Sequence, residues 1–314
     1  MKLHEALLLL LLPLSACWAE VVEDFTQRCP GFFATPNDVI SPPTRFNGDR
    51  YKQICQTQNG ERFFATFYDT ANKIPVYSAY KFNRLGNCRK CTRPTKWFIE
   101  PQLDEPVPEN IDMAKESTVR SENRGHNQAL HKDYKKRGYD RGHLAPVCHQ
   151  NLPRCVLATF TLTNAAPQLP EFNKDWYHNV EKKVSEILSS TCIPSNLRAY
   201  VVTGVVPGRE EINNRVRIPS HFWTAFCCLD NNNRTIRSSA FLAEYQQETW
   251  PQMSVQDLER RLTTLYNNLN TNIPFTLFGG GCYTAQNIQE TKGKRRKYSF
   301  EQKSEKRRKS IKTV

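Results

Sequence analysis

Apolar and aromatic residues cluster along this chain into short runs that predict β-strands. The runs are rich in β-branched and aromatic side chains, and Gly, Pro or Asn clusters separate them. Six segments fit this description: Arg62–Tyr68, Ile74–Phe82, Val156–Thr163, Tyr200–Val206, His221–Leu229 and Ser238–Leu242.

Two other segments show helical spacing. Between Asn173 and Ser189 one apolar stripe is formed by Trp176, Val180, Val184, Ile187 and Leu188. Val255–Leu269 is a second helix candidate, and the charged stretch Pro101–Arg137 predicts a mixture of helix and loop. We therefore predict an α+β fold with a central, mainly antiparallel sheet and flanking helices. About 295 residues can form one large domain or two.

The N-terminal end predicts a secretory signal peptide over residues 1–19. A weakly charged start precedes a short apolar run, Ala6–Leu14, and small residues end at Ala19. The fragment Leu14–Cys17 also resembles a bacterial lipoprotein signal, which is the alternative. The apolar run is too short to span a bilayer comfortably, and no later segment is long and apolar enough. We expect a soluble, secreted mature chain with no membrane partner.

The C-terminal end is strongly basic. Residues 290–314 contain eleven Lys and Arg against three Glu, so they carry +8 of the net charge of +13. With almost no apolar residues, this tail is expected to be disordered. It has three interpretations: a solvated end, an electrostatic arm for polyanions, or a nuclear import signal. We place the folded domain at residues 20–289 and the tail at 290–314.

Cysteine usage points to an oxidising compartment. Ten cysteines remain after residues 1–19, and an even number behind a signal peptide predicts disulfides. The spacing of the cysteines does not tell which of them pair. Cys88 and Cys91 form a C-x-x-C motif. A zinc site would need a second such pair, and a thioredoxin-like redox site would need a strand before the motif and a helix after it. Structural disulfides are therefore favoured. The sequon at Asn233, inside the polar run DNNNRT, predicts an exposed, glycosylated turn.

The segment GYDRGHLAP, residues 138–146, is the main candidate for chemistry. His143 has a side chain whose usual pKa suits a general base near neutrality. Arg141 can hold a phosphate through two parallel hydrogen bonds. We expect Gly142 to let the backbone turn sharply, so that both side chains reach one site. The alternative is a polar hairpin with a solvated histidine.

Downstream residues extend this candidate site into a recognisable pattern. TNAAPQ follows the motif, then Asn173 at the start of a predicted helix, then Glu181 eight residues later. Together these resemble the DNA/RNA non-specific endonuclease family, which has a ββα-metal active site. The segments VYSAYKFNR, YVVTGVVPG and RIPSHFWTAFCC are most similar to its endonuclease domain-containing 1 branch. The resemblance covers nearly the whole mature chain except the tail.

The resemblance implies a role for each matching residue. His143 would be the general base and Asn173 the direct ligand of one Mg²⁺, while Glu181 would hold a water of that ion. Arg141 and Asn164 would face the phosphate, and Asp140 would support the geometry of the motif. The family's upstream substrate arginine is not placed by any motif, although Arg84 and Arg93 are candidates. Thr163 stands where the family usually has Ser, and keeps the hydroxyl.

Each of these residues also has a simpler explanation. Asn173 could cap the helix, Glu181 could be a solvated helix residue, and Asn164 could end a strand. His149, His178 and His221 are interpreted as structural or exposed. Mg²⁺ keeps most of its waters, so one amide oxygen and one carboxylate are a sufficient anchor. On a regular helix, residues eight apart lie about 80° apart, close enough to flank one hydrated ion.

The predicted function is a secreted, Mg²⁺-dependent endonuclease that hydrolyses DNA and RNA with little sequence preference. The basic charge fits that substrate. One alternative is a catalytically inactive protein that binds nucleic acid or other polyanions on a nuclease scaffold. The other is a phosphodiesterase that acts on smaller nucleotides.

Overall fold

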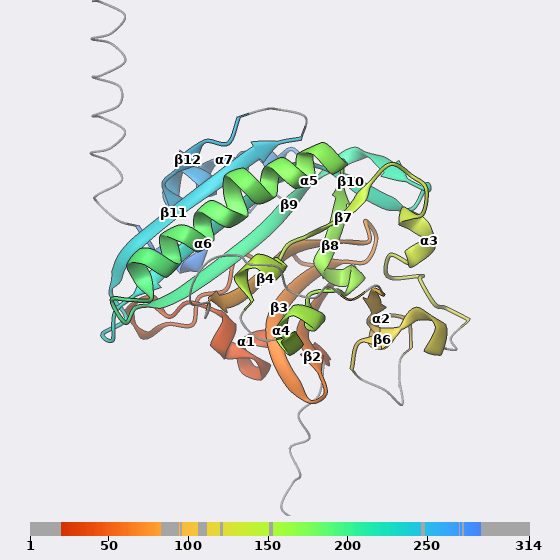
Figure 1. The fold of residues 1–314 in the computed structure, drawn as a ribbon, viewed down its shortest axis with the longest axis horizontal. Coiled ribbons are helices and arrows are strands. Elements are labelled where there is room, and N and C mark those ends of the chain that lie inside the picture. Colours follow the sequence, from red (N-terminus) through yellow and green to blue (C-terminus); the bar gives the residue numbers. More distant parts are fainter. Residues whose placement is uncertain are drawn as a thin grey trace, which may run out of the picture.

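An eight-stranded antiparallel sheet forms the centre of the computed structural model (Figure 1). The structure describes residues 20–82, 94, 96–105, 112–119, 122–150, 153–245, 249–269, 271 and 273–283. The predicted signal peptide, the basic tail, Cys88, Cys91, Arg84 and Arg93 lie outside these residues. The strand order is β1-β2-β3-β4-β9-β10-β11-β12, and each neighbouring pair is antiparallel. The predicted α+β fold with a central antiparallel sheet is confirmed.

The strands of this sheet include those predicted at five of the six apolar runs. Their bounds are β1 Glu20–Val22, β2 Tyr51–Gln58, β3 Glu61–Asp69, β4 Ile74–Phe82, β9 Arg198–Ile212, β10 Val216–Leu229, β11 Thr235–Glu244 and β12 Gln252–Met253. Smaller two-stranded pairs join β5 Phe98–Ile99 to β6 Ala114–Lys115, and β7 Asp140–His143 to β8 Ala165–Gln168.

The sixth predicted strand, Val156–Thr163, is wrong. Its first half belongs to α4 (Pro153–Ala158), and its end enters a 3-10 turn, Leu162–Asn164. Almost all described side chains of this run are buried. The sequence therefore shows no alternation of apolar and polar residues that would distinguish a strand from a helix. The Thr159 hydroxyl donates to the Val156 carbonyl at 2.7 Å, which stabilises the end of the helix.

Helices cover both faces of the sheet (Figure 1). On one face lie α5 (Pro170–Trp176) and α6 (Lys182–Ile187), whose apolar side chains pack with Val201, Phe222 and Phe226. On the other face, α7 (Val255–Asn267) packs with Val202, Trp223 and Leu242. The short helices are α1 Phe25–Arg28, α2 Pro101–Asp104 and α3 His131–Tyr134. Other 3-10 turns are Pro30–Phe32, Pro36–Asp38, Glu116–Thr118, Val147–His149 and Phe278–Gly280.

The helix that contains α5 and α6 has two π-helical turns, Tyr177–Glu181 and Leu188–Cys192. Its buried stripe has a spacing of four residues throughout: Phe172, Trp176, Val180, Val184, Leu188 and Cys192. On a regular α-helix that spacing would drift by about 200° over the stripe. Each π turn acts as one inserted residue, about 100°, so the two turns offset the drift and keep the stripe on the sheet.

Two disulfides link the central sheet to the segments packed on its two faces. Adjacent residues of a strand point to opposite faces, so Cys228 pairs with Cys192 at the end of the α5–α6 helix, whereas Cys227 pairs with Cys282 on the α7 face. Cys29 pairs with Cys55, and Cys148 is also disulfide-bonded. These pairings agree with the predicted structural disulfides.

Candidate active site

The DRGH motif forms strand β7, which pairs with β8 from Asp140 opposite Gln168 to His143 opposite Ala165. Because side chains alternate along a strand, Arg141 and His143 lie on the same side. Gly142 has no left-handed φ, so the expected sharp turn there is wrong. A Cβ at this position would lie 2.0 Å from Gln168 Oε1, so glycine is needed for close packing of β8.

An aromatic pair holds the imidazole of His143. The Trp97 ring centroid lies 4.7 Å from that of His143, and the Phe160 ring meets the imidazole edge-on at 4.8 Å. Trp97 and Phe160 also touch each other, with centroids 5.1 Å apart. The backbone N–H of Phe98 donates to the Phe160 carbonyl at 2.8 Å, which fixes the segment that carries Trp97. Two aromatic rings therefore pack against His143, which remains half-buried.

The guanidinium of Arg141 lies over two aromatic rings. Its Cζ is 5.6 Å from the Trp97 centroid and 5.3 Å from that of Tyr134, and one N–H donates to His131 Nδ1 at 3.0 Å. Burial, and secondarily the charge of Arg141, lower the pKa of His131, which favours the neutral acceptor form. Trp97 thus contacts both Arg141 and His143 and sets their relative position.

Asn164 does not face the site. It is fully buried, its Oδ1 accepts from Ser78 Oγ and the Ala145 N–H, and its Nδ2 donates to the carbonyls of Ala145 and Thr159. The amide therefore has no atom available for a phosphate, and the expected substrate contact is replaced by a structural role. Asn164 fixes the chain immediately after His143.

Asn173 is joined to the motif through Asp140. Its Nδ2 donates to Asp140 Oδ2 at 3.0 Å, which directs the amide oxygen away from that carboxylate. The helix has its N-cap at Leu169 and Pro170 at its first position, so Asn173 lies inside the first turns and is not a cap. The simpler capping explanation is thereby removed.

Glu181 lies on the same line of the helix as Asn173. Because the π turn Tyr177–Glu181 acts as one inserted residue, the two side chains project about 20° apart instead of the 80° expected for a regular helix. Glu181 is half-buried, and its backbone carbonyl accepts from His149 Nε2 at 2.8 Å.

The donor set suits a hard cation that keeps its waters. The described residues contain no group of three or more His, Cys, Asp or Glu side chains that could hold a metal ion. An oriented amide oxygen and a carboxylate aligned on one helix fit Mg²⁺, which takes oxygen ligands and retains water. They do not form the closed nitrogen and sulfur set of a structural zinc site.

Two further features lie away from this site. The Asn233 side chain is half-buried and hydrogen-bonds with Thr35, Asp38 and Arg198, so its turn is less exposed than expected. A glycan would be attached to Asn233 Nδ2, the nitrogen that donates to Asp38.

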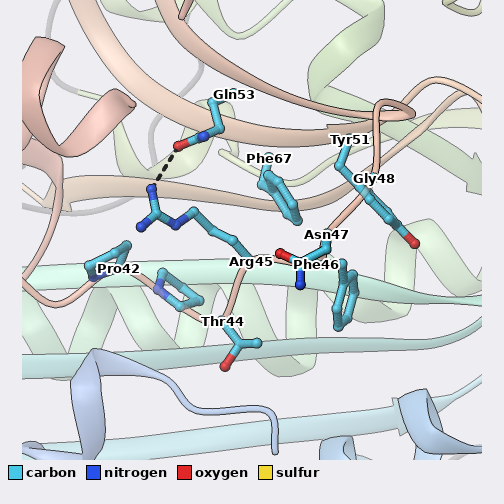
Figure 2. A pocket seen from close by; sticks show the side chains of 10 residues that line it. Pro42, Thr44, Arg45, Phe46, Asn47, Gly48, Tyr51, Gln53 and Phe67 are labelled. Carbon is cyan, nitrogen blue, oxygen red and sulfur yellow. Dashed lines mark hydrogen bonds between the residues drawn. The ribbon is translucent and has the colours of Figure 1, made fainter. Parts of the chain in front are cut away.

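A cavity of about 610 Å³ is lined by Arg45, Phe46, Tyr51 and Phe67 (Figure 2). Phe46 and Phe67 belong to the core beneath α7, so the cavity lies across the sheet from His143.

Four residues of the site were not predicted from the sequence: Trp97, His131, Tyr134 and Phe160. None belongs to a motif quoted above; the first three precede DRGH, and Phe160 follows it. The apolar stripe of the helix did contain a usable signal, because a spacing of four residues drifts around a regular α-helix unless π turns offset the drift. No helix in the described part of the chain is long and apolar enough to cross a membrane.

Comparison with known proteins identifies the family of the chain. Residues 47–275 match the family described as DNA/RNA non-specific endonuclease, so the chain belongs to that family and the resemblance is confirmed. The human endonuclease domain-containing 1 protein is 35% identical over 193 residues, which are 60% of this chain and 37% of that protein. Human mitochondrial endonuclease G is 30% identical over 148 residues, which cover 42% of this chain and 48% of that protein.

A solved chain from the crystal structure of the EndoG/EndoGI complex is 18% identical, with a TM-score of 0.48 over 77% of this chain and 90% of that one. The chain spans less than half the length of these two curated relatives.

Proposed function

We propose that this protein is a secreted, Mg²⁺-dependent endonuclease that hydrolyses phosphodiester bonds of DNA and RNA with little sequence preference. The main support for the proposal is the hydrogen bond between Asn173 and Asp140, which links the α5–α6 helix to β7. Arg141 and His143 share one side of the strand, and Asp140 links that strand to Asn173. Family membership supports the class of reaction.

In this proposal His143 takes a proton from the attacking water. Trp97 and Phe160 restrict the imidazole to one orientation, so little rotational freedom is lost when the substrate binds. Arg141 contacts the phosphate. Its two flanking rings and His131 hold the guanidinium in place before the substrate arrives, which is how a charged group stabilises a transition state effectively.

Asn173 and Glu181 would hold the metal ion. The Asn173 amide oxygen would be the protein ligand and the Glu181 carboxylate would lie within reach of the hydrated ion. Asp140 fixes the amide through the hydrogen bond that it accepts from Asn173 Nδ2. Bound Mg²⁺ supplies charge neutralisation at the phosphate and stabilisation of the leaving oxygen.

Three disulfides between described cysteines support passage through an oxidising compartment, and hence secretion. Glycosylation at Asn233 is part of the proposal and is tested by an electrophoretic mobility shift after enzymatic deglycosylation. An unchanged mobility would remove it.

Replacement of the base tests the function directly. His143→Ala should lower plasmid cleavage by about 10²–10⁴-fold, because a general base typically contributes that much. Circular dichroism should show an unchanged fold, and DNA binding should persist. His178→Ala, on the exposed surface of the helix, is the matched control.

Cleavage by His143→Ala at the wild-type rate would contradict the assignment. Binding by a wild-type protein that cleaves nothing would favour the inactive polyanion-binding alternative. Turnover of dinucleotides without shortening of long polymers would favour the small-nucleotide phosphodiesterase.

A further inference from the structure

His149 links the helix of Asn173 and Glu181 to the central sheet. Its ring is buried, with Nε2 2.8 Å from the Glu181 carbonyl oxygen and Nδ1 2.7 Å from the Tyr80 hydroxyl on β4. A carbonyl oxygen can only accept, so Nε2 donates to Glu181. In the neutral ring Nδ1 then accepts from Tyr80, whose pKa burial raises well above its usual value, so that the hydroxyl keeps its proton.

The hydrogen bond from His149 reaches the helix at the turn that sets the direction of the Glu181 side chain. Glu181 is the last residue of the first π turn, the turn that aligns its side chain with Asn173. π turns are rare and less stable than regular helix, so they persist where other contacts support them. The His149 bond reaches the backbone of that turn from outside the helix and ties it to the sheet.

The same bond also relates Glu181 to His143. His149 lies only six residues beyond His143, in the 3-10 turn Val147–His149. The intervening segment is fixed at its start, because the Leu144 N–H donates to the Asn164 carbonyl and the Ala145 N–H to Asn164 Oδ1. The Phe82 ring packs edge-on against the imidazole, with centroids 5.4 Å apart.

We propose that His149 is a positioning residue, which holds the π turn so that Glu181 stays aligned with Asn173 and at a fixed place relative to His143. The inference rests on the proposed role of Glu181 at the metal. Groups that orient metal-binding residues typically contribute about 10–100-fold to metal affinity.

The test measures metal binding without nucleic acid. Mn²⁺ serves as a paramagnetic stand-in for Mg²⁺, and its binding is followed by water proton relaxation. His149→Phe should weaken Mn²⁺ binding about 10–100-fold and raise the Mg²⁺ concentration for half-maximal plasmid cleavage by a similar factor. His149→Gln, whose amide can still donate to the Glu181 carbonyl, should recover part of the loss.

Two variants separate positioning from packing. Tyr80→Phe removes only the hydroxyl that orients the imidazole, so it should shift Mn²⁺ binding in the same direction by less, and it keeps the test available if His149→Phe does not fold. Phe82→Leu is the matched control, because it alters packing on the same ring without touching either hydrogen bond. It should lower thermal stability and leave Mn²⁺ affinity unchanged.

A double-mutant cycle with Glu181→Gln decides the matter. If His149 acts through Glu181, its substitution should change Mn²⁺ affinity little once Glu181→Gln is present. Additive effects, or wild-type affinity in both His149→Phe and Tyr80→Phe, would overturn the inference while the proposed function stands. Wild-type affinity in Glu181→Gln alone would instead contradict the role of Glu181, and the inference with it.

Discussion

At the scale of single residues, the site is organised by side chains that do no chemistry themselves. Trp97 touches both Arg141 and His143, and Asp140 orients Asn173. Asn164 shows how a residue can match a family pattern without meeting the substrate, because all its hydrogen bonds lie inside the protein. Its contribution should therefore be found in stability.

Asn164→Ala should lower the free energy of unfolding by about 3 kcal/mol or more. The truncation leaves buried donors and acceptors without partners, and each such group costs about 1–3 kcal/mol. Urea denaturation measures the change, with Asn179→Ala on the exposed helix surface as control. An unchanged unfolding midpoint for Asn164→Ala would argue against the structural role.

Glu100 gives a prediction about pH. Burial raises its pKa to about 7, although hydrogen bonds from Thr161 and Thr163 oppose the shift. A pKa that is higher in the folded state than in the unfolded state contributes stability that is present below about pH 4.5 and is lost as pH rises through 7.

Between pH 5 and 8, the free energy of unfolding of the wild type should fall relative to that of Glu100→Gln, whose amide stays neutral. Urea denaturation of both proteins at several pH values measures this difference. Parallel pH profiles would show that Glu100 is ionised in the folded protein throughout.

The residues proposed to have chemical roles stand out in the sequence because they fall in short motifs of fixed spacing. Asp140, Arg141 and His143 are consecutive or nearly so, and Asn173 and Glu181 share one helix. Trp97, Tyr134 and His131 could not be predicted, because their contacts depend on tertiary packing of short elements with no pattern of their own.

At the scale of elements, the α5–α6 helix carries the metal candidates and is fastened at both ends. Asp140 bonds it near its start, and Cys192 joins its end to Cys228 on β10. Strands β3, β4, β9, β10 and β11 were predictable from their apolar and aromatic content. Strand β2, with the polar sequence YKQICQTQ, was missed because it lacks that composition, and the Val156–Thr163 run was misassigned because burial on all sides hides the period.

Removing the Cys192–Cys228 bond should affect both stability and metal binding. The double variant Cys192→Ala/Cys228→Ala should lose about 2–5 kcal/mol of stability, and the freed helix end should weaken Mn²⁺ binding. Cys29→Ala/Cys55→Ala, which removes the bond on β2, is the matched control and should lower stability without changing Mn²⁺ affinity. Equal Mn²⁺ affinity in the two double variants would contradict the role of the helix anchor.

At the scale of the whole molecule, the sheet separates two packed layers. One contains the candidate active site, and the other contains α7 and the cavity beside Arg45 (Figures 1 and 2). The fold class could be predicted from the order of the apolar runs. The face of the sheet that each helix covers could not, because it depends on long-range contacts that no local pattern specifies. The net charge of +13 is a property of the whole chain, and most of it belongs to residues 290–314.

Deletion of residues 290–314 should weaken binding to long DNA and leave the chemical step intact. Each phosphate that the tail neutralises adds about 0.9 to the slope of log affinity against log salt, so the truncated protein should show a shallower slope. A salt titration of DNA binding in the His143→Ala background measures it, with an uncharged tail of equal length as control. Identical slopes would show that the tail does not contact the substrate.

Plasmid digestion by the purified protein is the direct test of whether this site hydrolyses nucleic acid with the help of a metal ion. Supercoiled plasmid should be nicked, linearised and degraded in Mg²⁺, remain intact in excess EDTA, and be cleaved again when Mg²⁺ is restored. Digestion that continues unchanged in EDTA would contradict the metal-dependent site. No cleavage under any metal condition, by a folded protein that binds DNA, would contradict the nuclease itself.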